Sequence, residues 1–333
     1  MRLTEVKRVT AKEILNVENL SVTFPASSGK IKAVRGISFD LKEGETLGIV
    51  GESGSGKSVT AFSVIGLLPE GADVKGRCVF NGSDLFSLSE KEFEALRGSE
   101  IGMIFQDPLS SLDPCFTIAD HLVGTLKAHG MKDKKAAWTQ AEEMLRSVGI
   151  KNSEQVMKQY PFELSGGMRQ RIMIAMALLC KPKLLLADEP TTALDVTVQD
   201  QILRLLKKLK SENRTSMLFI THNFGIVARL CDRVIVMYGG RVMERASVKE
   251  IFENPVHPYT RALLAAIPRM DDDKNVPLPA ISGHPHDPHS DFDGCPFMER
   301  CEYADEMCRR RPDEIFVREG HFAACYHIMR GEN

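Results

Sequence analysis

The run of eight residues from Gly51 to Ser58, GESGSGKS, carries the residue types that bind a nucleotide. Its Gly-x-x-x-x-Gly-Lys-Ser spacing is that of a phosphate-binding loop, in which backbone N–H groups close around phosphate oxygens. A Cβ at Gly54 or Gly56 would obstruct this approach. Lys57 would place its charge against the β- and γ-phosphates, and the Ser58 hydroxyl would bind Mg²⁺. The flanking TLGIV and SVTAFSVIGLL predict the strand and the helix that such a loop joins.

A pair of acidic residues follows a second predicted strand, in KLLLADEP. Asp188 and Glu189 would emerge at the carboxyl end of that strand, which is where ligands bind in open α/β sheets. Asp188 is expected to bind Mg²⁺, as the acidic residue at this strand end does in P-loop NTPases. Glu189, one residue further, can orient or deprotonate a water molecule. A kinase has no use for that second acid, so the pair favours hydrolysis.

A second candidate anion site lies in ELSGGMRQRIMIAMALLC. Apolar residues from Met168 to Leu179 recur at helical spacing, so a buried helix is expected just after Ser165, Gly166 and Gly167. A hydroxyl and bare backbone amides at a helix N-terminus can bind an anion. The chain already has one phosphate loop. We therefore expect this second loop to cap the γ-phosphate bound to a partner chain.

Taken together, these motifs resemble the ATP-binding cassette (ABC) ATPases over residues 14 to about 245. The chain has GESGSGKS, the glutamine of MIFQDP, LSGGMRQ, LLLADE, TALD and the histidine of FITHN, in the order of that family. One departure is Asn223, where many members have aspartate after the histidine. Asparagine keeps the hydrogen bonding and loses a charge, so little effect on the chemistry is expected.

The resemblance implies a role for each matching residue. Glu189 and His222 would be catalytic, and Asp195 would act across the dimer interface together with Ser165, Gly166 and Gly167. Ser58, Gln106 and Asp188 would bind Mg²⁺. Phe24 would stack on adenine, although it could equally be a core residue at a strand end. The implied ATP contacts are Phe24, Gly51, Ser53, Gly54, Ser55, Gly56, Lys57, Ser58, Val59 and Gln106.

The strands and helices that must position these residues, together with the resemblance, predict an α/β fold, a P-loop NTPase cassette of the ABC type. It would have a mixed-sheet core, an inserted helical subdomain and a small cysteine-rich C-terminal extension. Residues 1–250 are expected to form the cassette, with the helical subdomain at about 107–163. Residues 251–333 would form the extension, with a docking helix, a linker and a four-cysteine motif. The three histidines at 284–289 indicate a solvated linker rather than a metal site, because their spacing is irregular.

The extension also resembles a particular branch of the ABC family. NPVHPYTRALLAAIP places leucines and an isoleucine on one face of a predicted helix. The segment is similar to the one that follows the cassette in ATP-binding subunits of dipeptide/oligopeptide importers, a family that also includes nickel importers. This resemblance implies an ATPase that powers peptide import. Nickel or another small cargo is the alternative, since the cassette never touches the cargo.

Four cysteines close the chain, at positions 295, 301, 308 and 325. The N-terminus has no apolar signal-peptide region, so a reducing compartment is expected and disulfides are not. Cys295, Cys301, Cys308 and Cys325 could ligate a [4Fe–4S] cluster or a structural Zn²⁺. Their spacings of five, six and sixteen residues lack the short knuckle of zinc sites, which favours the cluster. Cys78, Cys115, Cys180 and Cys231 are scattered and expected to be buried.

Composition excludes other classes of partner. The 43 basic and 45 acidic side chains give a net charge of −2, and no basic patch suits a nucleic acid. A soluble ABC protein acting on DNA or ribosomes would have long heptads or a second cassette, and neither is present in 333 residues. The expected partners are a second, different ATPase chain, two transmembrane permease subunits and, indirectly, an extracytoplasmic peptide-binding protein. The chain would lie peripherally at the cytoplasmic face of the cell membrane.

Overall fold

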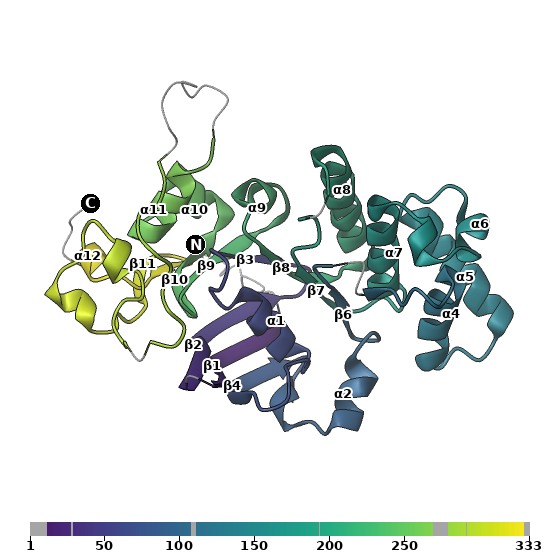
Figure 1. Cartoon of the computed structure of the whole chain (residues 1–333), viewed down its shortest axis with the longest axis horizontal. Coiled ribbons are helices and arrows are strands. Elements are labelled where there is room, and N and C mark those ends of the chain that lie inside the picture. The colour runs from purple at the N-terminus through teal and green to yellow at the C-terminus, as the bar shows by residue number, and fades with distance from the viewer. Residues whose placement is uncertain are drawn as a thin grey trace, which may run out of the picture.

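The computed structural model describes residues 12–27, 29–107, 111–192, 194–268, 279–290 and 292–329. Three regions follow one another along the long axis of the molecule (Figure 1). A lobe of helices lies at one end, two sheets form the centre, and the C-terminal residues lie at the other end. The predicted α/β cassette is confirmed.

The main sheet positions the nucleotide-binding motifs. Its eight strands have the order β11-β12-β10-β9-β3-β8-β7-β6. The strands from β9 to β6 pair in parallel, whereas β10, β12 and β11 pair antiparallel at one edge. Every residue of β3, β7 and β8 is buried, because helices or the second sheet cover both faces. The bounds are β3 Thr46–Val50, β6 Ile101–Ile104, β7 Leu184–Asp188, β8 Ser216–Thr221, β9 Arg233–Tyr238, β10 Arg241–Ser247, β11 Ile315–Arg318 and β12 His321–Ala323.

A second, antiparallel sheet packs beside the first with the order β2-β1-β4-β5. Its long strands alternate buried and more exposed residues, so one face meets the core and the other meets solvent. Helix α1 (Lys57–Val64) buries Ala61 and Val64 in the cluster that both sheets share. The remaining bounds are β1 Glu13–Ala26, β2 Gly29–Lys42, β4 Asp73–Phe80, β5 Ser83–Asp84, η1 Leu85–Ser87 and α2 Glu90–Leu96.

A lobe of helices lies between β6 and β7. Its elements are α4 Ile118–Ala128, α5 Lys134–Ser147, α6 Ser153–Met157, η2 Pro161–Glu163 and α7 Gly166–Leu178. Helix α7 is buried on more than one face, because its cluster joins the lobe to the main sheet. Helices α8 (Val196–Asn213) and α9 (Phe224–Leu230) cover the sheet beyond it. Among the helices of the described ranges, none combines the length and apolarity that a bilayer span requires.

The C-terminal residues are part of the same body as the cassette. Strand β12 pairs with β10 and thereby extends the main sheet, which the sequence did not indicate. Tyr259 and Phe297 are buried in one cluster with Val236 and Tyr238 of the cassette. A segment this short gains a core by sharing the cassette's core. The elements are α10 Val248–Glu253, α11 Pro258–Ala265, η3 Met298–Arg300, η4 Glu306–Arg309 and α12 Tyr326–Met329.

The histidine-containing segment is bonded to the cassette rather than wholly solvated. The backbone N–H of Lys32 donates to the carbonyl of Pro288 at 3.1 Å, and the N–H of His286 donates to the Tyr238 hydroxyl at 3.1 Å. His284 and His289 are exposed, as expected of a linker. The four scattered cysteines were also expected to be buried. Of these only Cys78 is buried, whereas Cys180 and Cys231 are half-buried and Cys115 is exposed.

Candidate functional site

The phosphate loop runs from the end of β3 into α1, and two of its glycines are required by close approach. A Cβ on Gly51 would lie 2.1 Å from the Met237 carbonyl oxygen, and one on Gly56 would lie 2.4 Å from the Ala33 carbonyl oxygen. Gly54 has φ +78° but nothing within 4 Å of its Cβ position. The crowding at Gly56 therefore comes from the chain itself, whereas Gly54 is needed for its backbone conformation.

Lys57 is the buried cation of this loop. Its Nζ donates to the carbonyl oxygens of Gly51 and Glu52, both at 2.8 Å. Burial lowers the pKa of Lys57, and the nearby carboxylates of Glu189 and Asp188 oppose that shift. The loop carbonyls thus hold the ammonium group inside the loop, where it can contact the phosphates of a nucleotide.

Oxygen ligands suited to Mg²⁺ meet beside the loop. The Ser58 hydroxyl donates to Asp188 Oδ1 at 2.9 Å, although the two residues are 130 positions apart. Burial raises the pKa of Asp188, which the bond from Ser58 partly offsets. Gln106 extends its amide to Glu189, with Nε2 3.3 Å from Oε2. Hydroxyl, carboxylate and amide oxygens are the ligands that a hard cation prefers, so these residues fit Mg²⁺.

Glu189 occupies a strained position with three side-chain donors around it. Its φ is +44°, which is uncommon for a residue other than glycine and typical of functional sites. His222 Nδ1 lies 3.1 Å from Oε1, and the Thr192 hydroxyl donates to Oε2 at 2.9 Å. Burial alone would raise the pKa of Glu189, but the bonds from His222 and Thr192 outweigh it and lower the pKa. The group is therefore a carboxylate that can accept a proton.

Thr192 is a site residue that the sequence analysis missed. It follows Glu189 by three residues, in the turn that closes after DEP. Its backbone N–H also donates to the Glu189 carbonyl, at 3.3 Å. The run of two threonines after DEP was the available signal, since hydroxyl side chains commonly bond a nearby acceptor in such turns.

The second predicted anion site lies at the start of α7. Ser165 is the N-cap, and its Oγ accepts the N–H of Met168 at 3.3 Å. Ser165 and Gly166 are exposed, and a Cβ on Gly167 would lie 3.2 Å from Val198 Cγ1 of α8. Hence the starts of α7 and α8 lie side by side.

The start of α8 is capped by Asp195, whose Oδ1 accepts the N–H of Val198 at 2.9 Å. Asp195 is exposed, and the next residue, Val196, is 81% exposed.

Phe24 is half-buried near the end of β1, opposite Ile31 of β2. It packs against the cluster shared by the two sheets. This position is compatible with both predicted roles of Phe24, as a core residue at a strand end and as a ring that stacks on adenine.

The structure brings the four C-terminal cysteines together around one pocket. Cys295, Cys301, Cys308 and Cys325 line it with apolar neighbours such as Phe297. Burial raises the pKa of Cys295 to about 12 and that of Cys301 to about 11. The neighbouring Cys308 and Cys325 contribute to the rise in both pKa values.

Backbone donors point at three of these sulfurs. The N–H groups of Phe297, Tyr303 and His327 bond to Cys295, Cys301 and Cys325 respectively, each two residues before the donor. Such bonds favour anionic sulfur. Four gathered thiols with amide donors fit a metal–thiolate group, whereas as neutral thiols they would gain little from this arrangement.

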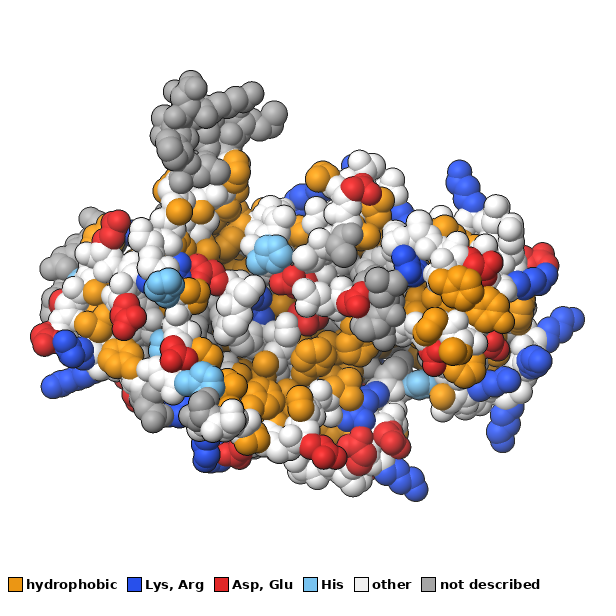
Figure 2. All heavy atoms as spheres, viewed as in Figure 1, with side chains coloured by type: hydrophobic (Ala, Val, Ile, Leu, Met, Phe, Trp, Pro, Cys, Tyr) orange, Lys and Arg blue, Asp and Glu red, His pale blue; other side chains and the backbone are white. Residues whose placement is uncertain are grey.

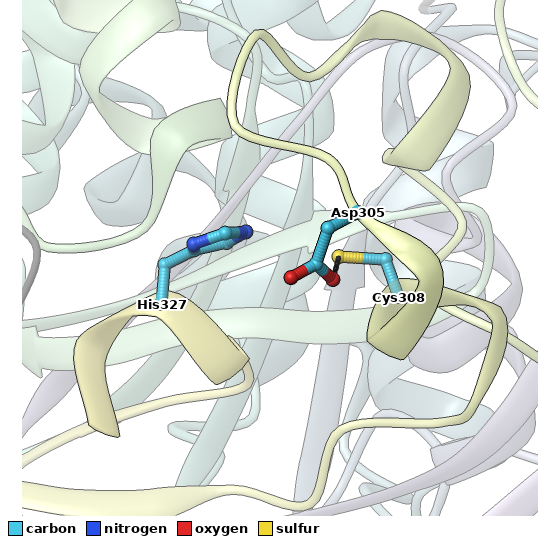
Figure 3. A group of neighbouring side chains, drawn as sticks. All are labelled: Asp305, Cys308 and His327. Carbon is cyan, nitrogen blue, oxygen red and sulfur yellow. Dashed lines mark hydrogen bonds between the residues drawn. The ribbon is translucent and has the colours of Figure 1, made fainter. Parts of the chain in front are cut away.

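Two further groups approach Cys308. Figure 3 shows the Asp305 carboxylate next to the Cys308 sulfur and the His327 ring beyond that carboxylate, and one ligand atom from each of the three residues lies within 4.8 Å of the others. The Cys308 Sγ is 3.7 Å from Asp305 Oδ1. Sequence spacing did not single out either residue, although His327 follows Cys325 by two positions. Cys308 is thus common to two candidate ligand sets.

The fold and the nucleotide-binding motifs define an ATP-binding cassette ATPase. Residues 34–192 match the family model described as ABC transporter, and residues 243–308 match that of the oligopeptide/dipeptide transporter C-terminal region. The chain belongs to the ATP-binding proteins of the oligopeptide/dipeptide ABC transporter family. The predicted resemblance and the predicted ATPase class are confirmed.

Curated relatives match nearly the whole chain. The oligopeptide transport ATP-binding protein OppD of Salmonella typhimurium is 47% identical over 316 residues, which is 95% of this chain and 94% of that protein. The dipeptide transport ATP-binding protein DppD of Bacillus subtilis is 47% identical over 318 residues, 95% of each chain.

A solved structure also resembles the cassette region. It is titled as a dimeric post-hydrolysis state of the ATP-binding cassette MJ0796 bound to ADP and Pi. The similarity has a TM-score of 0.64 at 28% identity and covers 70% of this chain and 98% of that one.

Proposed function

We propose that this chain hydrolyses ATP to power the import of di- or oligopeptides through an ABC transporter. The observation that carries the proposal is the C-terminal match at residues 243–308, which follows an ATP site with every motif present. The curated relatives that share both parts are named for oligopeptide or dipeptide transport. Nickel is the alternative cargo, but the relatives' names favour peptides.

In the proposed mechanism, the phosphate loop binds the ATP phosphates and Phe24 stacks on adenine. Lys57 contacts the β- and γ-phosphates, and Ser58, Asp188 and Gln106 would hold Mg²⁺. When bound, that ion would neutralise charge on the phosphates. Glu189 accepts a proton from the attacking water as the water oxygen bonds the γ-phosphorus. The bond from that phosphorus to the bridging oxygen breaks at the same time, so ADP leaves and phosphate is formed.

His222 and Thr192 have distinct parts in this proposal. Both bond Glu189 and so hold its carboxylate in one orientation. His222 additionally lies where it can bridge the γ-phosphate and the attacking water. A carboxylate held in one orientation by several donors loses little entropy when it positions the attacking water.

We further propose that the ATPase works as a head-to-tail dimer with a second, different ATPase chain. Ser165, Gly166 and Gly167 would cap the γ-phosphate bound to the partner, with Asp195 beside them. The exposed N-terminus of α7 supports this, because it offers a hydroxyl and backbone N–H groups to an anion.

The dimer would be coupled to two transmembrane permease subunits and would lie peripherally at the cytoplasmic face of the membrane. A hydrophobic patch covers part of the helical lobe (Figure 2). Phe116, Tyr160 and Phe162 are exposed residues of this region of the chain, and the rings of Tyr160 and Phe162 stack with centroids 5.5 Å apart. An exposed aromatic patch of this kind suits a permease contact. An extracytoplasmic binding protein would deliver the peptide.

Uptake by cells tests the cargo. Deletion of the gene for this chain should reduce uptake of a labelled tripeptide to background, because import requires ATP hydrolysis by the chain. Expression of the parent chain should restore uptake. Uptake of labelled nickel, measured in the same cells, should not change. Loss of nickel uptake with unchanged tripeptide uptake would overturn the peptide assignment.

For the thiol pocket we propose a [4Fe–4S] cluster ligated by Cys295, Cys301, Cys308 and Cys325, with structural Zn²⁺ as the alternative. The amide donors at the sulfurs support thiolate ligation. Its role would be structural, because bonds to all four cysteines leave no iron site open. It would stabilise a segment too small to form its own core.

Anaerobic purification tests the cluster. The parent chain should be brown, with broad absorption near 400 nm that is general to such clusters, and should contain iron and acid-labile sulfide. Cys301→Ser should lose most of both. His327→Ala is the matched control, because it removes the mixed Asp305–Cys308–His327 set and leaves the four thiols. A colourless protein with about one zinc per chain would contradict the cluster.

A further inference from the structure

One buried arginine of the tail is bonded directly to the phosphate loop. Arg300 has 6% of its side chain exposed, and its Nη1 donates to Glu52 Oε2 at 2.7 Å and to the Tyr238 hydroxyl at 3.1 Å. Its Nε and Nη2 donate to the carbonyls of Ser282 and Ile281, at 2.9 and 3.1 Å. A guanidinium held by four acceptors is fixed in one orientation.

Glu52 is the second residue of the phosphate loop, and each of its polar groups has a partner. The carboxylate accepts from Arg300, and the backbone N–H donates to the Tyr259 hydroxyl at 3.0 Å. The backbone carbonyl accepts from Lys57 Nζ at 2.8 Å. Two residues of the C-terminal extension therefore set the position of the residue that holds the loop's cation.

Each of these two residues neighbours a residue that lines the thiol pocket. Arg300 directly precedes Cys301, which lines the pocket. Phe297 also lines the pocket, and its ring centroid is 5.1 Å from that of Tyr259. Two sets of contacts thus connect the pocket to Glu52: one runs from Cys301 through Arg300, and the other runs from Phe297 through Tyr259. This end of the chain lies beside β10 in Figure 1.

We propose that Arg300 is a positioning residue for the nucleotide site and that it couples the thiol pocket to the phosphate loop. When metal–thiolate bonds fix Cys301, Arg300 holds Glu52 and, through its carbonyl, Lys57 in the nucleotide-binding arrangement. When those bonds are lost, the loop loses this support and nucleotide affinity falls. The coupling rests on the proposed metal in the pocket, whereas the contact between Arg300 and Glu52 does not.

Thermodynamic linkage makes the proposal reciprocal. If metal in the pocket strengthens nucleotide binding, nucleotide must strengthen metal retention by the same factor. Couplings of this type are commonly about 5- to 150-fold. If Arg300 only stabilised the tail, Arg300→Ala would change metal retention by the same factor with and without nucleotide.

The first arm of the test measures ADP affinity by calorimetry on the full chain, since ADP carries the β-phosphate and is not turned over. Arg300→Ala should weaken ADP binding about tenfold. Arg309→Ala is the matched control: it lies in the same tail, is 65% exposed and pairs with Glu306, so its affinity should match the parent's. Glu52→Gln breaks the ion pair from the loop side and leaves the tail intact, which covers the case that Arg300→Ala does not fold.

The double variant Glu52→Gln/Arg300→Ala should bind ADP no more weakly than the weaker single variant, because the two changes remove one interaction. Additive losses, or parent-like affinity in both single variants, would overturn the role of Arg300.

The second arm follows metal release from the pocket to a chelator, with and without ADP. In the parent ADP should slow release at least about fivefold, and in Arg300→Ala the two rates should be equal. Equal rates in the parent would overturn the coupling. If the protein holds no metal, the cluster proposal fails. The metal-dependent coupling then fails as well. The rate at which Cys301 is alkylated, followed by mass spectrometry with and without ADP, is then measured in place of the rate of metal release. Protection of Cys301 by ADP in the parent but not in Arg300→Ala would still support the positioning role of Arg300, and a lack of protection in the parent would show that the loop and the pocket are not connected.

Discussion

Steady-state ATP hydrolysis by a Glu189→Gln variant should fall by about 10²- to 10⁴-fold, while ATP binding is retained. Glutamine has the size of glutamate and keeps one oxygen, which can contact either His222 or Thr192, whereas the carboxylate offers a separate oxygen to each. An amide does not accept a proton from water. The loss therefore reports the proton transfer rather than a distorted site. Phosphate release under saturating ATP and Mg²⁺ measures it.

Lys57→Ala separates this role from binding. Removing the ammonium group deletes the charge that contacts the phosphates, so nucleotide affinity itself should fall. Calorimetry with ADP should show this loss for Lys57→Ala and parent-like affinity for Glu189→Gln. Turnover near the parent rate in Glu189→Gln would show that Glu189 is not the base.

The second large effect is expected at the start of α7. In the presence of the partner ATPase chain, Glu189→Gln should form an ATP-dependent dimer that persists because hydrolysis is blocked. Adding Gly166→Asp should abolish that dimer, since a carboxylate would face the γ-phosphate of the partner's nucleotide. Size-exclusion chromatography with light scattering, with and without ATP, measures both states.

Gly166→Asp causes no clash within the chain itself, so its effect on dimerisation reports the contact with the partner. A Cβ on Gly166 meets nothing within 4 Å, and aspartate in the first turn of a helix is favourable. Gly124→Asp is the matched control, because Gly124 is exposed on α4 and its Cβ position is equally open. A Gly166→Asp chain that still dimerises with ATP would refute the two-site arrangement.

The nucleotide-binding half of this protein was predictable because its chemistry depends on short local patterns. The loop from Gly51 to Ser58 joins a strand to a helix, and the Asp188–Glu189 pair follows a fully buried strand. Parallel strands end at the same edge of a sheet, so residues that follow such strands meet there. The 2.9 Å bond between Ser58 and Asp188 is the direct consequence of that rule.

The details around Glu189 were harder to foresee. Its positive φ and the Thr192 hydroxyl bond arise in a turn whose conformation the sequence only partly indicates. Likewise, the periodicity from Met168 to Leu179 predicted a buried helix. Only the structure shows what covers it, because α7 packs between the lobe and the sheet.

The sequence by itself determined the ATPase class, the order of its motifs and the presence of four C-terminal cysteines. Only the tertiary structure decided that this tail shares the cassette's core, extends its sheet through β12 and places Arg300 against Glu52. The two residues are 248 positions apart, and no local pattern encodes a pairing at that separation. Such contacts form because a short segment can bury its apolar residues only against a larger body, and that burial determines which side chains meet.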